Sequence, residues 1–444
     1  MYREKNILIL GLARSGYSVA KLLVKMGANI TINDINEEQD ESIISELESI
    51  GVKLILGEHP VDLLDNDYDM IVKNPGIPLN HIYVRQANVM EIPITTEIEV
   101  AYNCMSDAKY IAITGTNGKT TTSTLIYEML KKAGKDTYLV GNIGNPISNY
   151  YDVYTTNTIF VVEISAQQLN DCEKFNAEVA VLTNLSEAHM EFFDNIETYY
   201  KTKKSLFNNM NKNHLAIING NCEESLNWTY NIISQKKYFS IAEKVDGAYL
   251  YNDEIICDNS KFNISDIALV GKHNYENIMC AILAVKRYGI DDDSIKAVLS
   301  EFRGVNHRME FVRIINDVKY YNDSKSTNIK SCKVALESFN INTSLILGGL
   351  ERGQDFKELL PHLNYVTRVF CYGETKERIK EVMDSFKIEC IVCVDLQDAI
   401  IGAHDKSIAG SVVLFSPACA SWDEFDNFEQ RGDLFKLIVN SFKN

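Results

Sequence analysis

A short loop rich in glycine and hydroxyl residues constrains this chain more than any other feature. Residues 114–120 read Thr-Gly-Thr-Asn-Gly-Lys-Thr and directly follow the apolar run 110–113. A buried strand that ends in such a loop, with a helix expected over 121–132, forms a cradle of backbone N–H groups for a phosphate. Lys119 adds a positive charge, and the hydroxyl of Thr120 suits Mg²⁺. The pattern predicts an α/β domain that binds a nucleoside triphosphate, although a chance turn before a helix has the same composition.

The spacing of this loop separates it from the commonest ATPase motif. That motif leaves four residues between its first glycine and the Gly-Lys pair, and Ile113 occupies the corresponding place here. The loop is therefore a shorter variant.

The composition is that of an ordinary globular protein. At 444 residues, with 45% apolar and 24% charged residues, the chain predicts two to three domains. No apolar stretch approaches the roughly 20 residues that span a bilayer, and the N-terminal residues predict a first buried strand rather than a signal peptide. We therefore expect no membrane insertion.

Charge and cysteine usage exclude other classes of protein. A net charge of −17 argues against a nucleic-acid partner, which would need a basic face. Ten scattered cysteines predict free thiols in a cytoplasmic protein. The one close pair, Cys390 and Cys393, would point to opposite faces of a strand, so we expect no zinc site.

Alternating apolar strands and amphipathic helices predict three α/β segments, with boundaries at 1–96, 97–304 and 305–444. In the first, strands are expected at 7–10, 29–32, 53–56 and 70–72, with helices at 17–26 and 39–49. A turn of the dinucleotide type follows the first strand, but Ala13 replaces its middle glycine, and Asp34 ends the second strand. This imperfect fingerprint marks an anion site more than an NAD site.

The second and third segments continue the same alternation of strands and helices. In the second segment, strands are expected at 158–163, 179–183 and 216–219, with helices at 196–210 and 274–287. In the third, strands are expected at 318–321, 344–347, 366–372 and 412–415, with helices at 329–339 and 434–442. Both segments therefore predict parallel α/β sheets.

Two residues of the second segment have the chemistry of a metal site, and a third is a lysine expected to point inward. Glu163 ends a strand, as a carboxylate that organises Mg²⁺ does, and His189 follows the next strand, although either residue would also be ordinary at the surface. Lys203 lies among three lysines in four positions, which is typical of a solvated face. At helical spacing, however, it shares a stripe with Tyr199 and Leu206, which predicts that it points inward.

The third segment has a second polar turn between a strand and a helix. Asp323 and Lys325 lie in Asn-Asp-Ser-Lys-Ser-Thr-Asn (322–328), which suits ribose or phosphate but also an ordinary helix cap. Arg308 lies shortly before this turn. The small residues at 416–421 follow another strand and allow backbone to approach a ligand.

The motifs TGTNGKTTT, VEIS, NLSEAHME, YYKTKKSLF, GKHNYEN, NHRME, NDSKSTN and LGGLERGQDF resemble, in order and spacing, those of the Mur ligases of peptidoglycan synthesis. The resemblance covers essentially the whole chain, and the segment 416–432 is similar to that of members that add D-glutamate. It implies three domains: a Rossmann-like parallel sheet for the UDP-sugar, a central P-loop ATPase-like α/β domain, and a Rossmann-like C-terminal domain for the amino acid.

The resemblance implies substrates and roles residue by residue. The substrates would be UDP-N-acetylmuramoyl-L-alanine, ATP and D-glutamate, used by a monomer with two Mg²⁺ ions and a carbamylated lysine. The UDP-sugar would contact Ala13, Arg14, Ser15, Asp34, Asn74, Pro75, Gly76 and Asn142. ATP would contact Gly115, Thr116, Asn117, Gly118, Lys119, Thr120, Thr121, Asn274, Asn277, Arg308 and Asp323. The metal ligands would be Thr120, Glu163, His189 and the carbamylated Lys203. D-glutamate would contact Thr327, Arg352, Ser421 and Phe428. The catalytic groups would be Lys119, Glu163, His189, Lys203, Arg308, Asp323 and Lys325.

The mechanism implied is attack of a carboxylate on the γ-phosphorus of ATP, followed by attack of the D-glutamate amine on the acyl phosphate. Either His189 or Asp323 would take the proton of the amine, and the C-terminal domain is expected to close when ATP binds. The sequence departs from the family pattern at Arg352, Trp422 and the pair Ile35–Asn36.

Other functions remain as alternatives. The nearest is a related amide ligase that adds L-alanine, a diamino acid, a dipeptide or folate glutamates. The others are an NAD-dependent oxidoreductase, which Ala13 disfavours, and a non-catalytic nucleotide switch, which would not need the full set of ionisable residues.

Overall fold

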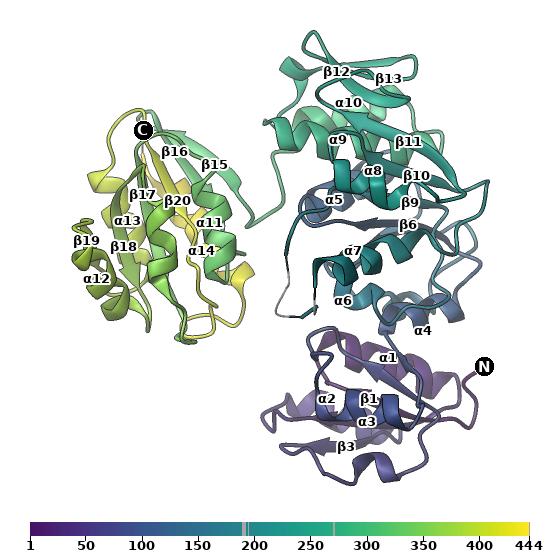
Figure 1. Ribbon diagram of the computed structural model, residues 1–444. Coiled ribbons are helices and arrows are strands. Elements are labelled where there is room, and N and C mark those ends of the chain that lie inside the picture. Colours follow the sequence, from purple (N-terminus) through teal and green to yellow (C-terminus); the bar gives the residue numbers. More distant parts are fainter. Residues whose placement is uncertain (189–191, 194, 270, 444) are drawn as a thin grey trace. The chain divides into compact units, whose positions relative to one another are not determined.

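The computed structural model describes residues 1–188, 192–193, 195–269 and 271–443. Within these ranges the chain forms three β-sheets, each with helices packed against it (Figure 1). It divides into two compact units, residues 1–302 with two of the sheets and residues 303–444 with the third. The predicted mixed α/β fold with three sheets is confirmed.

The first sheet is entirely parallel and has the strand order β3-β2-β1-β4-β5. Its elements are β1 (Asn6–Leu10), α1 (Arg14–Lys25), β2 (Asn29–Asp34), α2 (Glu41–Ser49), β3 (Lys53–Leu56), η1 (Leu63–Asp65), β4 (Met70–Lys73), α3 (Ile82–Val89) and β5 (Ile94–Thr95). The order reverses between β1 and β4, so the loops after these two strands meet at one edge, where ligands bind in such sheets.

The second sheet has the order β14-β13-β12-β11-β10-β9-β6-β8-β7 and is parallel from β7 through β12. Its strands are β6 (Lys109–Thr114), β7 (Thr137–Gly141), β8 (Ile159–Glu163), β9 (Val179–Leu182), β10 (Leu215–Asn219), β11 (Gln235–Ser240), β12 (Gly247–Tyr251), β13 (Glu254–Cys257) and β14 (Ser260–Asn263). Its helices are α4 (Glu97–Cys104), α5 (Lys119–Lys132), η2 (Ile147–Tyr150), α6 (Ala166–Leu169), α7 (Ile196–Lys204), η3 (Ser205–Phe207), α8 (Glu223–Thr229), η4 (Ile264–Asp266), α9 (Lys272–Lys286) and α10 (Asp292–Glu301).

The third sheet has the order β15-β16-β20-β17-β18-β19, in which only the β15–β16 pair is antiparallel. Its elements are β15 (Glu310–Ile315), β16 (Val318–Asn322), α11 (Ile329–Leu336), β17 (Thr343–Gly348), η5 (Phe356–His362), β18 (Val366–Tyr372), α12 (Lys376–Ser385), β19 (Cys390–Val392), α13 (Leu396–Lys406), β20 (Val412–Phe415) and α14 (Phe428–Ser441).

Strand alternation explains why the second sheet is covered on both faces. Ile111 and Ile113 pack into a cluster with α5 and α9, whereas Tyr110 and Ala112 pack into the cluster on the opposite face. Side chains of neighbouring residues in a strand point to opposite faces, so a continuous apolar run buries both faces of the sheet.

The observed elements correct several predicted boundaries. The helix expected over 196–210 ends at Lys204 and continues as one 3₁₀ turn, and the C-terminal helix begins at Phe428 rather than at 434. Strand β12, which joins the parallel part of its sheet to the antiparallel part, and the antiparallel strands β13, β14 and β15 were not predicted. Among the described residues, no helix is long and apolar enough to cross a bilayer.

Candidate active site

The loop between β6 and α5 forms a tight cradle that only glycine permits at two positions. Gly115 and Gly118 have positive φ angles of +142° and +83°. A Cβ atom at Gly115 would lie 1.9 Å from Thr183 Oγ1, and one at Gly118 would lie 2.2 Å from Asn277 Oδ1. Helix α5 has no side-chain cap in the described chain. Its first N–H groups can therefore serve an anion.

The remaining members of the loop are held by the loop after β9. Asn117 N donates to Asn184 Oδ1 at 2.9 Å, and Thr116 Oγ1 donates to the carbonyl oxygen of Ser186 at 3.0 Å. Asn277 accepts from Thr122 and contacts Asn274 through its amide at 3.4 Å. Helix α9 thereby brings both predicted asparagines close to the start of α5, where Thr121 also lies.

Two lysines converge on one carbonyl oxygen of this loop. Lys119 Nζ and Lys203 Nζ lie 3.0 and 2.8 Å from the carbonyl oxygen of Gly115. Lys203 is only 1% exposed, as its helical stripe predicted. Burial, with the nearby charge of Lys119, holds the pKa of Lys203 well below its ordinary value, and the charge of Glu163 opposes this shift.

Glu163, at the end of β8, is the buried carboxylate of this region. It is 1% exposed, and its Oε1 accepts a hydrogen bond of 2.8 Å from Asn142 Nδ2. Its Oε2 has no hydrogen-bond partner in the described chain. An unpaired, buried carboxylate oxygen is costly unless a cation or donor satisfies it. Because Thr120, only 3% exposed, lies in the first turn of the adjacent helix α5, hydroxyl and carboxylate oxygens suitable for Mg²⁺ lie in this region.

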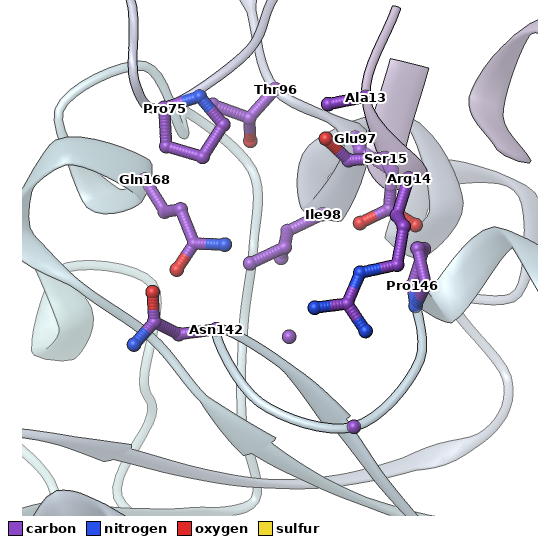
Figure 2. A pocket seen from close by; sticks show the side chains of 12 residues that line it. Ala13, Arg14, Ser15, Pro75, Thr96, Glu97, Ile98, Asn142, Pro146 and Gln168 are labelled. Carbon is purple, nitrogen blue, oxygen red and sulfur yellow. The ribbon is translucent and has the colours of Figure 1, made fainter. Parts of the chain in front are cut away.

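A cavity of about 210 Å³ lies beside this region, between the loops of the first sheet and those of the second (Figure 2). Five residues predicted for the UDP-sugar line it: Ala13, Arg14, Ser15, Pro75 and Asn142. The guanidinium of Arg14 and the amide of Gln168 are directed into the cavity from opposite sides (Figure 2). Helix α1 begins at this cavity without a side-chain cap in the described chain, which adds N–H groups suited to an anion.

The other predicted UDP-sugar residues support the cavity rather than line it. Asp34 accepts hydrogen bonds from the backbone N–H groups of Leu12 and Asn36, at 2.7 and 2.8 Å. Asn74 Nδ2 donates to Ser15 Oγ at 3.1 Å, and Asn74 Oδ1 accepts from Gly76 N. These residues fix the two loops from which the lining residues project.

Sequence reasoning missed three polar residues that line the cavity, Thr96, Glu97 and Gln168. Glu97 Oε1 accepts from both the N–H and the hydroxyl of Ser148 at 2.7 Å, and burial raises the pKa of its carboxyl group. The available signals were the caps of two helices, because Thr96 precedes α4 and Gln168 completes the capping box of α6 with Ser165.

In the second unit, Asp323 follows β16 and is almost fully buried. Its Oδ1 accepts from Met309 N at 3.1 Å and its Oδ2 from Ser416 Oγ at 2.7 Å. Burial raises the pKa of Asp323 to about 7, while these hydrogen bonds and the charge of Arg308 oppose the shift.

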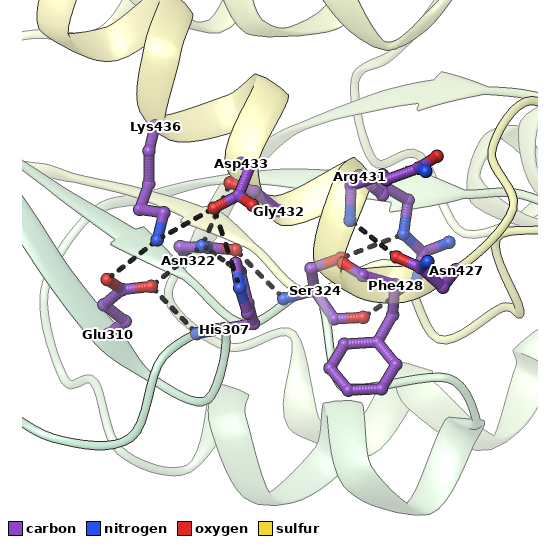
Figure 3. Close-up of polar contacts among 11 residues, drawn as sticks. His307, Glu310, Asn322, Ser324, Asn427, Phe428, Arg431, Gly432, Asp433 and Lys436 are labelled. Carbon is purple, nitrogen blue, oxygen red and sulfur yellow. Dashed lines mark hydrogen bonds and ion pairs between the residues drawn. The ribbon is translucent and has the colours of Figure 1, made fainter. Parts of the chain in front are cut away.

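Helix α14 holds the segments that carry Arg308 and Lys325 (Figure 3). Asn322 Nδ2 contacts His307 Nδ1, Glu310 Oε2 and the carbonyl oxygen of Gly432, at 3.0–3.2 Å. Arg431, which is fully buried, donates to both oxygens of Ser324 and to the carbonyl oxygen of Cys419. Sequence reasoning did not single out His307 or Arg431.

The residues predicted for D-glutamate contact different partners. Lys325 Nζ lies 5.6 Å from the ring of Phe428, whose carbonyl oxygen accepts from Ser324 Oγ. The guanidinium of Arg352 lies 4.5 Å from the ring of Trp422. Ser421, beside that tryptophan, is 2% exposed.

Two further predicted site residues are Thr327 and His189. Thr327 lies in the turn before α11, where its backbone N–H donates to the carbonyl oxygen of Lys325. His189 lies outside the described residues.

Comparison with known proteins gives matches along most of the chain. Residues 5–96 match the Mur ligase MurD-like N-terminal domain, residues 113–285 the Mur ligase middle domain, and residues 307–419 the Mur ligase glutamate ligase domain. A Geobacillus protein (strain WCH70) named UDP-N-acetylmuramoylalanine–D-glutamate ligase is 41% identical, over 100% of this chain and 99% of its own length. A Bacillus mycoides protein (strain KBAB4) with the same name is 39% identical over 99% and 98%.

Solved structures share the fold at low identity. UDP-N-acetylmuramate–alanine ligase from Thermotoga maritima has a TM-score of 0.60 at 17% identity, over 99% of this chain and 100% of its own. A pseudomurein peptide ligase type C from Methanothermus fervidus has a TM-score of 0.56 at 18% identity, with the same coverage. Together with the domain matches and the full-length relatives, these similarities show that the chain belongs to the Mur ligase family, within its MurD-like branch.

Proposed function

We propose that this chain is an ATP-dependent ligase that joins D-glutamate to UDP-N-acetylmuramoyl-L-alanine and releases ADP and phosphate. The reaction would be a cytoplasmic step of peptidoglycan precursor synthesis, carried out by a monomer. The name of relatives about 40% identical over the whole chain supports this assignment, and so does the cavity beside the phosphate loop.

The observation that carries the proposal is the hydrogen bond between Asn142 and Glu163. Asn142 lines the cavity proposed for the sugar nucleotide, and Glu163 is the buried carboxylate near the phosphate loop. One contact of 2.8 Å therefore joins the two sites. Such proximity is what an enzyme needs to bring the carboxylate of one substrate to the γ-phosphorus of another.

The residues present fit a magnesium ion. The unpaired Oε2 of Glu163 and the hydroxyl of Thr120 would hold one Mg²⁺, and His189 with a carbamylated Lys203 would hold the second. When bound, Mg²⁺ would offset the negative charge of the phosphates.

The chemistry of Lys203 supports a carbamate. Lys203 Nζ is buried, donates to a carbonyl oxygen and lies over the ring of Tyr199. Burial and the nearby charge of Lys119 favour the neutral amine over the opposing effect of Glu163, and a neutral amine can react with CO₂. The product carries oxygen atoms that can ligate a metal ion. We expect Lys203→Ala to lose activity and short carboxylic acids to restore part of it; an unchanged activity of the variant would contradict the role.

The proposed reaction has two steps. The terminal carboxylate of the L-alanine residue attacks the γ-phosphorus, ADP leaves, and an acyl phosphate forms, with Lys119 offsetting charge on the transferring group. The amine of D-glutamate then attacks the acyl carbon, and phosphate leaves as the amide forms. His189 or Asp323 would accept the proton of the amine, and a pKa of about 7 suits Asp323 to this role.

In the second unit, Arg308, Asp323 and Lys325 would contact the nucleotide, and Thr327, Arg352, Ser421 and Phe428 would contact D-glutamate. Arg352 can bind a carboxylate through two parallel hydrogen bonds. The guanidinium of Arg352 lies over the ring of Trp422, so the tryptophan would help to orient it.

Release of phosphate from ATP tests the assignment. We expect release with UDP-N-acetylmuramoyl-L-alanine and D-glutamate, and none when D-glutamate is replaced by L-glutamate, L-alanine or diaminopimelate. Release with a different amino acid would reassign the chain to another ligase of the family. No release with any of these amino acids would contradict the proposed activity.

A further inference from the structure

A buried ion pair outside the proposed reaction links the two sheets of the first unit. Lys73, the last residue of β4, places its Nζ 3.0 Å from Oδ2 of Asp171, which follows α6. The side chains are 0% and 10% exposed, so water screens this pair little. Buried ion pairs contribute little net stability compared with apolar residues of similar size, because desolvation offsets their attraction. We therefore look for the role of this pair in the segments that it joins and not in its contribution to stability.

One side of the pair holds the turn that contributes Pro75 to the cavity. Lys73 Nζ also donates to the carbonyl oxygen of Ile77 at 3.3 Å, so the lysine spans the turn 74–77. Asn74, in the same turn, donates to Ser15. Pro75 and Ser15 both line the cavity, and the contacts of Lys73 thus reach one of its walls.

The other side of the pair holds the opposite wall. Asp171 lies three residues after Gln168, which lines the cavity, and its second oxygen accepts from Asn170 Nδ2 at 2.8 Å. Lys73 Nζ also lies 5.8 Å from the ring of Phe192.

We propose that Lys73 and Asp171 are positioning residues that set the distance between the two walls of the sugar-nucleotide cavity. The lysine fixes the wall formed by Ser15 and Pro75, and the aspartate fixes the wall formed by Gln168. Loss of the pair widens the cavity and weakens binding of the UDP-sugar without altering the phosphate loop. This inference rests on the proposed function, because it takes the cavity as the sugar-nucleotide site.

Two variants that disrupt the pair, one conservative variant and one control test the proposal. Lys73→Met/Asp171→Leu replaces the pair by apolar side chains and avoids an unpaired buried charge. Asp171→Asn removes the countercharge with the least change of shape. The control is Lys25→Met, because Lys25 pairs with Asp152 in an exposed ion pair between the same two parts of the unit.

The measurements are the KM for UDP-N-acetylmuramoyl-L-alanine, the KM for ATP, kcat and the melting temperature. We expect both variants to raise the KM for the sugar nucleotide by at least about tenfold and to change the KM for ATP by less than about twofold. Lys73→Arg keeps the positive charge beside Asp171. It should therefore retain part of the affinity for the sugar nucleotide that the double variant loses. The control should match the wild type in every kinetic constant.

A wild-type KM for the sugar nucleotide in a folded variant would overturn the proposal, even if the melting temperature fell. If the double variant does not fold, Asp171→Asn decides. Calorimetric titration with UDP separates this inference from the proposed function, because it needs no turnover. A wild type that binds UDP but makes no product would contradict the activity alone, whereas variants that bind UDP as tightly as the wild type would contradict the positioning role.

Discussion

Glu163, Lys203 and Asp323 are ionisable side chains that are at least 96% buried, with exposed fractions of 1%, 1% and 4%. Burial of such groups costs free energy unless partners satisfy them, and each lies at the carboxyl edge of a sheet or against the phosphate loop. Groups of this kind cluster at functional sites, because their environment tunes their chemistry.

Glu163→Gln should separate activity from stability. The amide oxygen can still accept from Asn142, but the variant lacks the negative charge that would hold Mg²⁺. We expect kcat to fall by about 10³-fold while the melting temperature stays within a few degrees of the wild type, since a buried charge is removed. The assay is phosphate release together with thermal unfolding. Retention of more than a tenth of the activity would contradict the role of Glu163.

Asp323 predicts a pH dependence of stability. Its folded-state pKa of about 7 lies above the ordinary value, so between about pH 4 and pH 7 the folded protein holds a proton that the unfolded chain has released. The free energy of unfolding should therefore fall as the pH rises through this window. Asp323→Asn removes this contribution, and relative to the wild type it should gain on the order of a few kcal/mol between pH 5 and pH 8. Urea unfolding at both pH values checks this, and parallel curves would contradict it.

At the scale of elements, the junction of β6 and α5 depends on two glycines. Gly118→Ala should raise the KM for ATP by about tenfold or more, because the added Cβ displaces Asn277 and distorts the loop. The matched control is Gly134→Ala, which has a positive φ of +71° but open space around the added atom. It should lower stability by about 1 kcal/mol and leave the KM for ATP unchanged. Equal kinetic effects of the two substitutions would contradict the steric explanation.

Elements were predicted well where apolar runs meet turn residues. The strands 53–56, 366–372 and 412–415 match the observed bounds, because each is a short apolar run between turns. The strands β12, β13 and β14 escaped prediction. In β14 (Ser260–Asn263), Phe262 is the only apolar residue, so its sequence carries no strand pattern. In β12 and β13 the apolar residues occupy runs of only three or four positions, which are too short to separate a strand from other buried segments. Helix α7 ends early because Ser205 begins a 3₁₀ turn, which a helical stripe does not reveal.

The site was predictable where residues follow strands. Lys119 and Glu163 were predicted from motifs at strand ends, and the inward orientation of Lys203 was predicted from helical spacing. Glu97 was not predicted as a cavity residue. Its place in the cavity depends on the packing of α4 against η2 through Ser148, which lies 51 residues away in sequence. The roles of these residues in binding remain predictions.

At the scale of the whole molecule, the two units each present residues that we propose as ligand contacts at the carboxyl ends of parallel strands. In the first unit these ends carry the phosphate loop, Glu163 and the cavity, and in the second they carry Asp323 and the segment after β20. Loops at this edge of a parallel sheet can change without altering the strands that position them. The same fold can therefore serve ligases with different amino-acid substrates.

Transfer of oxygen from substrate to phosphate tests the central claim most directly. UDP-N-acetylmuramoyl-L-alanine labelled with ¹⁸O in its alanine carboxylate is incubated with ATP, D-glutamate and the enzyme, and the released phosphate is analysed by mass spectrometry. If the carboxylate attacks the γ-phosphorus, one ¹⁸O atom appears in each phosphate released. Amide formation with unlabelled phosphate would show that no acyl phosphate forms and would contradict the proposed chemistry.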